Sequence, residues 1–248
     1  MPNPATLPLL LKELRLSAIA RSWENVVHTA QEKSWSYERC LATLCEQEIA
    51  ARYSKRIHRY LKEAKLPAGK TLATFDFKYA KSVNMAHIQA LAENSSWLDK
   101  AENLIIFGPS GVGKSHIAAA IGHALVDQGI RCFFSSTSSL VQKLQLARKE
   151  FRLPDVMHKL DKYPAIILDD IGYAKKDESE TNVLFELIAH RYETGSLIIT
   201  ANQPFSEWDK IFQDNMMVVA AIDRLVHHAT IINVQGESYR KMVAASKQ

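Results

Sequence analysis

The chain is poor in cysteine, and this excludes a fold that depends on a framework of disulfide bonds. Only three cysteines occur among its 248 residues, at positions 40, 45 and 132. An odd number of thiols forms no closed disulfide framework, and the spacing of the first two does not fit a zinc knuckle. We therefore expect free thiols in a reducing compartment.

The sequence also lacks a long apolar run. A membrane-spanning helix needs about 20 consecutive apolar residues, and no segment approaches that length. The segment "LPLLL" near the start is shorter than the apolar core of a secretion signal, and no basic segment precedes it. These absences predict a cytoplasmic protein with no membrane partner.

Apolar residues are plentiful, whereas charge is unevenly distributed. Hydrophobic residues make up 47% of the chain, which is enough to build a core and to exclude wholesale disorder. The net charge is +4, but residues 1–100 hold 15 Lys/Arg against 10 Asp/Glu, and residues 101–248 hold 16 against 17. An N-terminal excess of positive charge points to nucleic acid or another polyanion.

The hydrophobic pattern divides the chain into three parts. Residues 1–66 have apolar residues at helical spacing and predict a small all-α domain, with Ser36 as a helix N-cap and Pro67 ending the last helix. Residues 67–103 predict a connector with a short helix near 85–92. Residues 104–248 predict a separate α/β domain.

Short apolar runs alternate with helical patterns in this last part. We predict five strands, in the order "LIIF", "RCFF", "AIIL", "LIIT" and "TIINV". Strands that are apolar on both faces and separated by helices are typical of a parallel sheet between helices.

A complete phosphate-binding motif follows the first of these strands. The segment "GPSGVGKS" matches G-x-x-x-x-G-K-[ST] and opens a predicted helix, which is the context that the motif requires. Glycines let successive backbone N–H groups face phosphate oxygens, and the helix N-terminus adds positive potential. We expect Lys114 to reach the β- and γ-phosphates and Ser115 to bind Mg²⁺. The expected nucleotide-binding residues are Gly108, Pro109, Ser110, Gly111, Val112, Gly113, Lys114, Ser115 and His116.

Polar residues at the ends of two later strands predict the rest of a hydrolytic site. "AIILDDIG" places two carboxylates after a buried strand. We assign Asp169 to Mg²⁺ and Asp170 to the attacking water. Asn202 follows the next strand, where a neutral amide can also hold water. Arg224 is either an arginine finger directed at a neighbouring subunit or a surface residue paired with Asp223.

These motifs together resemble the IstB-type transposition helper ATPases of bacterial insertion sequences. The resemblance extends over nearly the whole chain and includes "RYSKRIHRYLKEAKLPAGKTLATFDF", "LDDIGY", "LFELIAHRYETGSLIITANQPFSEW" and "DRLVHHATIINVQGESYR". This family is related to the DnaC-type helicase loaders within the AAA+ class. One departure is Ala201, where the family often has Ser.

The resemblance implies a three-layer AAA+ core, ATP-driven assembly into a homo-oligomeric ring or spiral, binding of double-stranded DNA, and a transposase partner. It makes Lys114 a catalytic residue beside Asp170, and it matches Asn202 to a sensor position and Arg224 to the box VII arginine. It also suggests Arg240 as a C-terminal residue that senses the nucleotide.

The segment "RYSKRIHRYLKEAK" carries six Lys/Arg against one Glu. Such an excess predicts contact with the phosphate backbone of DNA, with affinity that falls steeply with salt and little sequence preference. The alternative is a solvated helix face, which is what most charge runs are. The expected DNA-binding residues are Arg52, Lys55, Arg56, Arg59 and Lys62. A second basic group, at Lys143, Arg148, Lys149 and Arg152, is equally well explained as an ordinary exposed helix.

Three other functions fit parts of the same sequence. A replicative helicase loader would share the ATP site and use its N-terminal helices to hold a helicase. A P-loop kinase of a small metabolite would need an acceptor pocket and no basic N-terminal domain. A non-hydrolysing scaffold would bind ATP and never require Asp170.

Overall fold

The computed structural model describes residues 4–80, 82–172, 177–210, 215–239 and 242. The chain divides into two compact units, Met1–Arg59 and Tyr60–Gln248. The boundary lies inside one long helix, α3 (Tyr37–Ala64). The last residues of that helix and all of 67–103 therefore belong to the second unit. Among the described residues, every helix is too short or too polar to span a bilayer.

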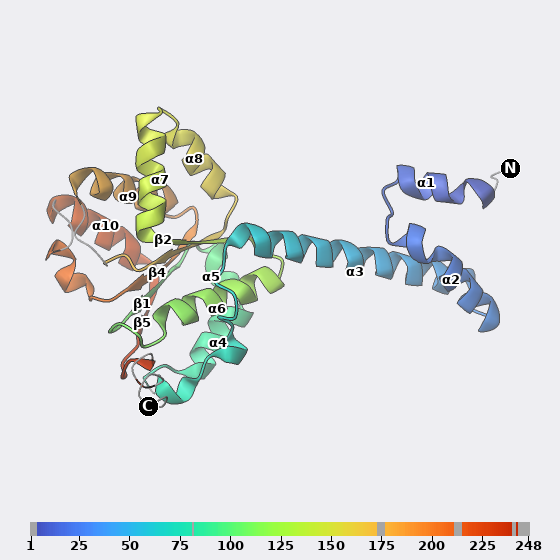
Figure 1. The fold of residues 1–248 in the computed structure, drawn as a ribbon, viewed down its shortest axis with the longest axis horizontal. Helices are drawn as coiled ribbons and strands as arrows, with labels where there is room; N and C mark the ends of the chain where they lie inside the picture. Colours follow the sequence, from blue (N-terminus) through green and yellow to red (C-terminus); the bar gives the residue numbers. More distant parts are fainter. Residues whose placement is uncertain (1–3, 81, 173–176, 211–214, 240–241, 243–248) are drawn as a thin grey trace. The chain divides into compact units, whose positions relative to one another are not determined.

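The first unit is a small helical bundle. It contains η1 (Pro4–Thr6), α1 (Leu7–Glu13), α2 (Ile19–Glu32) and most of α3. Figure 1 shows α1 and α2 beside the N-terminal half of α3. Ser36 precedes α3 and its hydroxyl accepts a hydrogen bond from the Arg39 N–H at 3.3 Å, as an N-cap does. A few apolar side chains form the core of this bundle: Leu11, Ile19, Val26 and Leu44, with Leu7, Leu16, Trp23, Trp35 and Cys40 at its margin.

A buried carboxylate joins two of these helices. Glu48 of α3 is 5% exposed, and its Oε2 accepts hydrogen bonds from the N–H groups of Ala18 and Ile19, where α2 begins. Its Oε1 accepts a hydrogen bond from Arg52 Nε at 2.8 Å. The bond to Arg52, and after it the bonds to the two N–H groups, lower the pKa of Glu48. A negative charge at a helix N-terminus is favourable, so this contact holds α2 against α3.

The second unit is built on a five-stranded parallel sheet in the order β2-β3-β4-β1-β5. The strands are β1 (Asn103–Phe107), β2 (Cys132–Ser136), β3 (Ala165–Asp169), β4 (Ser196–Ala201) and β5 (Ala229–Asn233). Each strand overlaps one of the predicted apolar runs, although Arg131 of "RCFF" and Val234 of "TIINV" lie just outside β2 and β5. β1 and β4 are buried along their whole length, as expected for strands covered on both faces.

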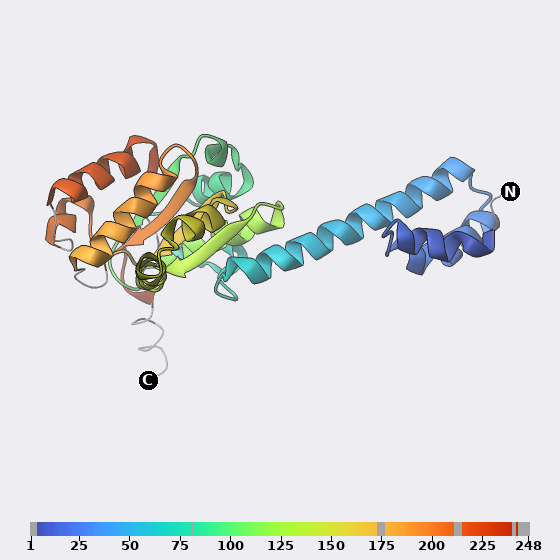
Figure 2. The ribbon, with the colours of Figure 1, turned by 90° about the horizontal axis from the view of Figure 1, so that it is seen from above.

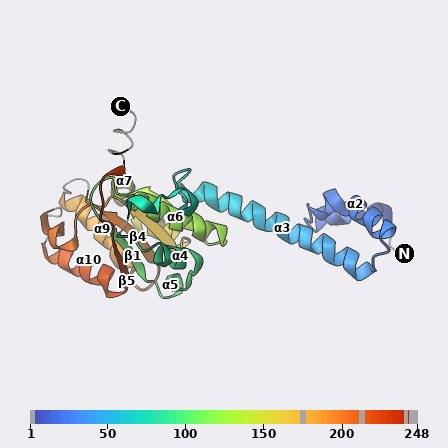
Figure 3. The same ribbon diagram turned by 90° about the horizontal axis from the view of Figure 1, so that it is seen from below.

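Helices cover both faces of this sheet. The helix α6 (Lys114–Asp127) packs on β1, β2, β3 and β4, with α4 (Met85–Glu93) beside it (Figure 3). The opposite layer is formed by α7 (Thr137–Lys149), α9 (Glu178–Arg191) and α10 (Asn215–His227), which lie next to one another (Figures 1 and 2). The remaining short elements are η2 (Leu72–Thr74), η3 (Phe77–Tyr79), α5 (Ser96–Asp99), α8 (Leu153–Asp161) and η4 (Phe205–Lys210).

The strand order decides where the polar residues meet. β1 lies between β4 and β5, and β4 lies between β1 and β3. In a parallel sheet the carboxyl ends of neighbouring strands share one edge. The segments that follow β1, β3 and β4 are therefore brought together at that edge.

Candidate functional site

The loop after β1 wraps around the N-terminus of α6. Gly113 is the N-cap of α6 with φ of 101°, a left-handed conformation that favours glycine. A Cβ on Gly113 would lie 2.6 Å from the ring of Phe75. A Cβ on Gly108 would lie 2.1 Å from the carbonyl oxygen of Val234. The motif glycines thus allow this loop to curl while other segments pack closely against it.

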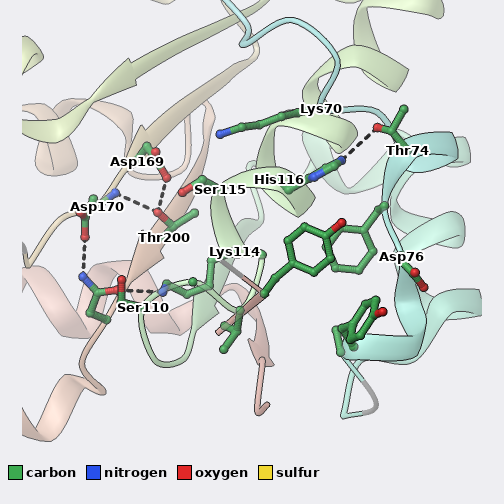
Figure 4. A pocket seen from close by; sticks show the side chains of 18 residues that line it. Lys70, Thr74, Asp76, Ser110, Lys114, Ser115, His116, Asp169, Asp170 and Thr200 are labelled. Carbon is green, nitrogen blue, oxygen red and sulfur yellow. Dashed lines mark hydrogen bonds between the residues drawn. The ribbon is translucent and has the colours of Figure 1, made fainter. Parts of the chain in front are cut away.

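The side chain of Lys114 is held at the centre of this loop. It is only 6% exposed, and its Nζ donates hydrogen bonds of 2.8 Å to the Pro109 carbonyl and to Asn202 Oδ1. Asn202 in turn donates from Nδ2 to Asp170 Oδ1 at 2.8 Å. The motif lysine, the amide after β4 and the second carboxylate after β3 therefore form one continuous chain of hydrogen bonds (Figure 4).

Thr200 fixes the two carboxylates. It is 1% exposed, and its hydroxyl donates to Asp169 Oδ1 at 2.6 Å while accepting a hydrogen bond from the Asp170 N–H at 2.8 Å. Asp170 has a φ of 62°, which an aspartate tolerates better than most residues. This backbone turn points the two adjacent carboxylates to different partners. Sequence reasoning missed Thr200, although its place two residues before Asn202 on β4 was visible.

A cavity of about 550 Å³ lies in front of these groups. Figure 4 shows their side chains around it. Ser110, Ser115, Asp169 and Asp170 line one side together with Lys114. The opposite side is formed by the segment before β1 and by Tyr239; the lining residues there are Lys70, Thr74, Phe75, Asp76, Tyr79 and Ala80.

His116 ties that opposite wall to α6. Its Nε2 donates to the Thr71 carbonyl at 2.9 Å and lies 3.2 Å from the Thr74 hydroxyl. The ring of Phe75 packs edge-on against it, with centroids 5.1 Å apart. Burial, and after it the charge of Lys70, lowers the pKa of His116, although the bond to Thr71 acts in the opposite direction. The imidazole is therefore neutral at pH 7.

The expected metal ligands lie in the same cavity. Ser115 and Asp169 offer a hydroxyl and a carboxylate, and oxygen donors of this kind are what Mg²⁺ prefers. A hydroxyl hydrogen bond to Asp169 Oδ1 fixes that carboxylate. The donor set fits Mg²⁺ better than a softer metal, because it consists of oxygen atoms and includes neither a thiol sulfur nor an imidazole nitrogen.

Among the described residues, Arg224 does not line this cavity. Arg224 is exposed on α10, where its Nη1 donates to the Ala220 carbonyl at 3.0 Å, and it borders a separate apolar hollow of about 170 Å³ with Phe185 and Met217. Arg240 lies outside the described residues.

The expected DNA-binding residues on α3 are all exposed, but they differ in what they contact. Arg52 bonds to Glu48 and donates to the Arg15 carbonyl at 3.1 Å. Lys55 donates to the Ser17 hydroxyl at 3.0 Å. The guanidinium of Arg56 lies over the Tyr53 ring, 5.1 Å from its centroid. Arg59 and Lys62 complete the set.

Comparison with known proteins gives a consistent result. The family model described as IstB-like ATP binding protein matches residues 9–246. The chain is 50% identical over 242 residues to a putative insertion sequence ATP-binding protein of Sinorhizobium fredii, covering 98% of this chain and 81% of that one. The fold is similar to the crystal structure of the DnaC helicase loader, with a TM-score of 0.58 at 19% identity over 71% of this chain and 99% of that one. It is also similar to AMPPCP-bound DnaA from Aquifex aeolicus, with a TM-score of 0.57 at 19% identity over 74% and 56% of the two chains.

Proposed function

The chain belongs to the IstB-like ATP binding protein family, with an AAA+ P-loop core, and we propose that it is an ATP-dependent DNA-binding helper of transposition. In this proposal ATP-bound copies assemble on double-stranded DNA as a ring or spiral in the cytoplasm. The assembly selects or remodels the target DNA and stimulates the transposase of the element. Hydrolysis of ATP then drives disassembly of the ring or spiral. The observation that carries the proposal is the hydrogen-bonded chain from Lys114 through Asn202 to Asp170.

That chain of side chains suits phosphate cleavage. Lys114 brings a fixed positive charge to the loop that faces the β- and γ-phosphates. Asp170 orients the attacking water and accepts its proton. Asn202 accepts a hydrogen bond from Lys114 and donates one to Asp170. It therefore keeps both side chains in position at the site where the phosphates would bind. Such fixed dipoles need little reorganisation during the reaction.

Ser115 and Asp169 would hold Mg²⁺ beside the phosphates. The bound ion would supply neutralisation of phosphate charge. Thr200 keeps Asp169 in place for this role. At the far end of the cavity, the rings of Tyr79 and Tyr239 meet edge to face with centroids 5.3 Å apart. We propose that the adenosine lies near them, with the Asp76 carboxylate available as a hydrogen-bond acceptor for its amino group.

The position of Arg224 supports assembly. An exposed arginine outside its own phosphate cavity is suited to enter the cavity of a neighbouring copy and stabilise charge there. In that arrangement ATP binds the assembled state better than the single chain, and this difference in affinity sets how far ATP drives assembly.

DNA binding is supported by the basic residues of α3. Arg52, Lys55, Arg56, Arg59 and Lys62 are all exposed, and each cation that meets a phosphate releases counterions. Arg52 also stabilises the helical bundle through Glu48. We therefore propose that Arg52 contributes less to DNA affinity than the cations that follow it.

A binding measurement with random duplex DNA tests the proposal. Labelled duplex is titrated with ATP, with ADP and without nucleotide, over a salt series, and particle size is followed in the same samples. We expect tight, salt-sensitive binding and large particles with ATP only. Absence of duplex binding in every nucleotide state would refute the DNA-binding function.

A replicative helicase loader is the alternative function. The fold of DnaC is compatible with it, but the fold is shared with several replication proteins and does not discriminate. The 50% identity to an insertion sequence protein favours the transposition helper. The two can be separated by offering the ATP-bound chain a replicative helicase or an insertion sequence transposase: the helper retains only the transposase.

A further inference from the structure

The turn between α7 and α8 presents an aromatic ring to solvent. Figure 1 shows this turn at the end of α7 that points away from the sheet. Phe151, which lies in the turn, is 95% exposed. It follows the helix C-cap Glu150, and its φ is 56°. The Phe151 N–H donates to the Arg148 carbonyl at 3.0 Å, and the next N–H, of Arg152, donates to the Ala147 carbonyl at 2.8 Å.

This pair of hydrogen bonds is the Schellman arrangement, in which the residue after the C-cap is usually glycine. A side chain with a Cβ is strained in this left-handed conformation, and a bulky one is a clear outlier. Seven described non-glycine residues have a positive φ, and Phe151 is the only aromatic one: the others are Arg15, Ser34, Lys65, Ala101, Asp170 and Glu193.

Exposure adds a second disadvantage. The neighbouring Leu153 and Val156 pack against the main core, whereas Phe151 does not. A fully exposed ring gains none of the stabilisation that burial of apolar surface supplies. Both the backbone conformation and the hydration of the ring would therefore be improved by glycine. The folded structure of this unit gives no reason for phenylalanine at this position.

Cations outnumber carboxylates in the sequence around the ring, where the exposed Glu150 directly precedes it. Lys149 precedes the turn and is exposed, and Arg152 follows it, 3.4 Å from Glu150. Arg148 pairs with Glu186 of α9. Lys143 lies further along the exposed face of α7. An apolar ring between cations at the tip of two helices matches the chemistry of a base stack between phosphates.

We propose that Phe151 is an apolar wedge that enters between base pairs of duplex DNA, while Lys149 and Arg152 contact the flanking phosphates. Inserted side chains of this kind partly unstack a base step and kink the duplex, which lets the DNA wrap around more protein surface. This inference rests on the proposed DNA-binding function, and it names the residue at which the duplex is deformed.

Replacement of Phe151 by glycine tests the wedge with two opposite effects. Because glycine relieves the strained backbone, we expect the Tm of Phe151→Gly to rise by about 2–4 °C. Because the wedge is lost, we expect duplex affinity to fall by about tenfold, with a smaller bend. The slope of affinity against salt stays unchanged, since an apolar ring releases no counterions. Affinity is measured by anisotropy over a salt series, and bending by energy transfer between labels at the two ends of the duplex.

Three variants serve as controls, and particle size is followed for each. Phe151→Leu keeps an apolar wedge and should retain the bend. Leu146→Ala removes another exposed apolar side chain of α7, 57% exposed, and should change neither affinity nor bend. Lys149→Ala should reduce the salt slope by about 0.9.

The outcomes separate the wedge from the wider function. If the unmodified chain binds and bends duplex DNA and Phe151→Gly does so equally well, the wedge is overturned while the DNA-binding function stands. If Phe151→Gly weakens binding to single strands but not to duplex, the wedge is likewise overturned. If the unmodified chain binds no duplex in any nucleotide state, both proposals fail.

Discussion

The polar side chains of the phosphate cavity and the cations of α3 differ in how each is held. In the cavity, Lys114, Asn202 and Asp170 are linked in series by hydrogen bonds of 2.8 Å, and Thr200 contacts both carboxylate residues. On α3, Lys55 donates to the hydroxyl of Ser17, and the guanidinium of Arg56 lies over the ring of Tyr53. The cavity holds individual polar atoms in fixed positions, whereas α3 presents several exposed charges that act together.

This difference determines what a substitution does. Groups that act as a connected unit are strongly non-additive, because removing one disturbs the rest. Exposed cations that meet a polyanion contribute nearly independently, since each releases its own counterions. We therefore expect abrupt losses in the cavity and graded losses on α3.

The largest effect is expected for Lys114→Ala. The change removes the cation of the phosphate loop and one anchor of Asn202. Charge-assisted hydrogen bonds to phosphate contribute about 1.5–3 kcal/mol each, so ATP affinity should fall by at least about tenfold to hundredfold, and hydrolysis should fall below detection. Calorimetric titration with ATP and phosphate release measure the two. Lys70→Ala, in the opposite wall, is the matched control; an equal loss there would show that the effect is not specific to the cation of the phosphate loop.

Asp170→Asn should separate binding from hydrolysis. The amide oxygen can still accept the hydrogen bond from Asn202 Nδ2, so we expect ATP affinity to stay within about threefold. It cannot accept a proton, and general-base catalysis contributes roughly 10²–10⁴-fold. Single-turnover hydrolysis should fall by that amount while ATP-dependent assembly persists. Unchanged hydrolysis would remove Asp170 from the reaction, and Asp76→Asn controls for loss of negative charge in the cavity.

Thr200→Val should lower the stability of the protein, because it removes the hydroxyl that positions the two carboxylates. Valine keeps the shape but leaves the Asp170 N–H and Asp169 Oδ1 without their partner hydroxyl. A fully buried group left without its partner costs about 1–3 kcal/mol. Because Asp169 and Asp170 are only half-buried, we expect the lower end for each, about 2 kcal/mol together, and a fall in Tm of about 4–8 °C. Thr200→Ser restores the hydroxyl and should restore the Tm in a thermal melt. If valine and serine behave alike, the hydroxyl does not organise the carboxylates.

The fold of the second unit was predictable because its signals are local. Each strand is a short apolar run, and the phosphate-binding motif lies between a strand and a helix, so sequence spacing alone predicts a parallel sheet and the edge at which Asp169 and Asn202 meet. The roles assigned to these residues remain predictions, as do those of Arg224 and the cations of α3.

The supporting contacts were not predictable, because they join residues far apart in the sequence. Thr200 meets Asp169 across 31 positions, and His116 meets Thr71 across 45. A threonine on a buried strand and a histidine on a helix have no pattern that names such partners. The apolar spacing of α3 was also misleading about burial, since Tyr37 is 89% and Leu41 62% exposed. Periodicity gives a face of a helix but not what covers it.

On α3, a double substitution should change the salt dependence more than the fold. Arg56→Ala with Arg59→Ala removes two exposed cations, so the slope of log affinity against log salt should become shallower by about 1.8. Because the two residues lie outside the Glu48 contact, the Tm should change little. Lys12→Ala with Lys33→Ala removes the same charge elsewhere in the first unit and controls for long-range attraction. An unchanged slope would make this face a docking surface for a protein.

The smallest effect is expected from His116, which links the two walls of the cavity. Burial lowers the pKa of His116 in the folded chain. In the unfolded chain a histidine titrates at about 6.5, so the unfolded chain binds the proton more readily than the folded one. The stability that neutral His116 contributes is therefore present above that value and is lost as the pH falls through the lower folded pKa. Below about pH 6, ATP affinity and Tm should both decrease slightly, the latter by about 1–2 °C. His116→Gln keeps a side-chain N–H for the Thr71 carbonyl but does not titrate, so its affinity and melting curves should lose this part of the pH dependence. If the variant follows the same pH profile as the unmodified chain, the proton acts on the charged groups of the cavity and not on the link between its walls.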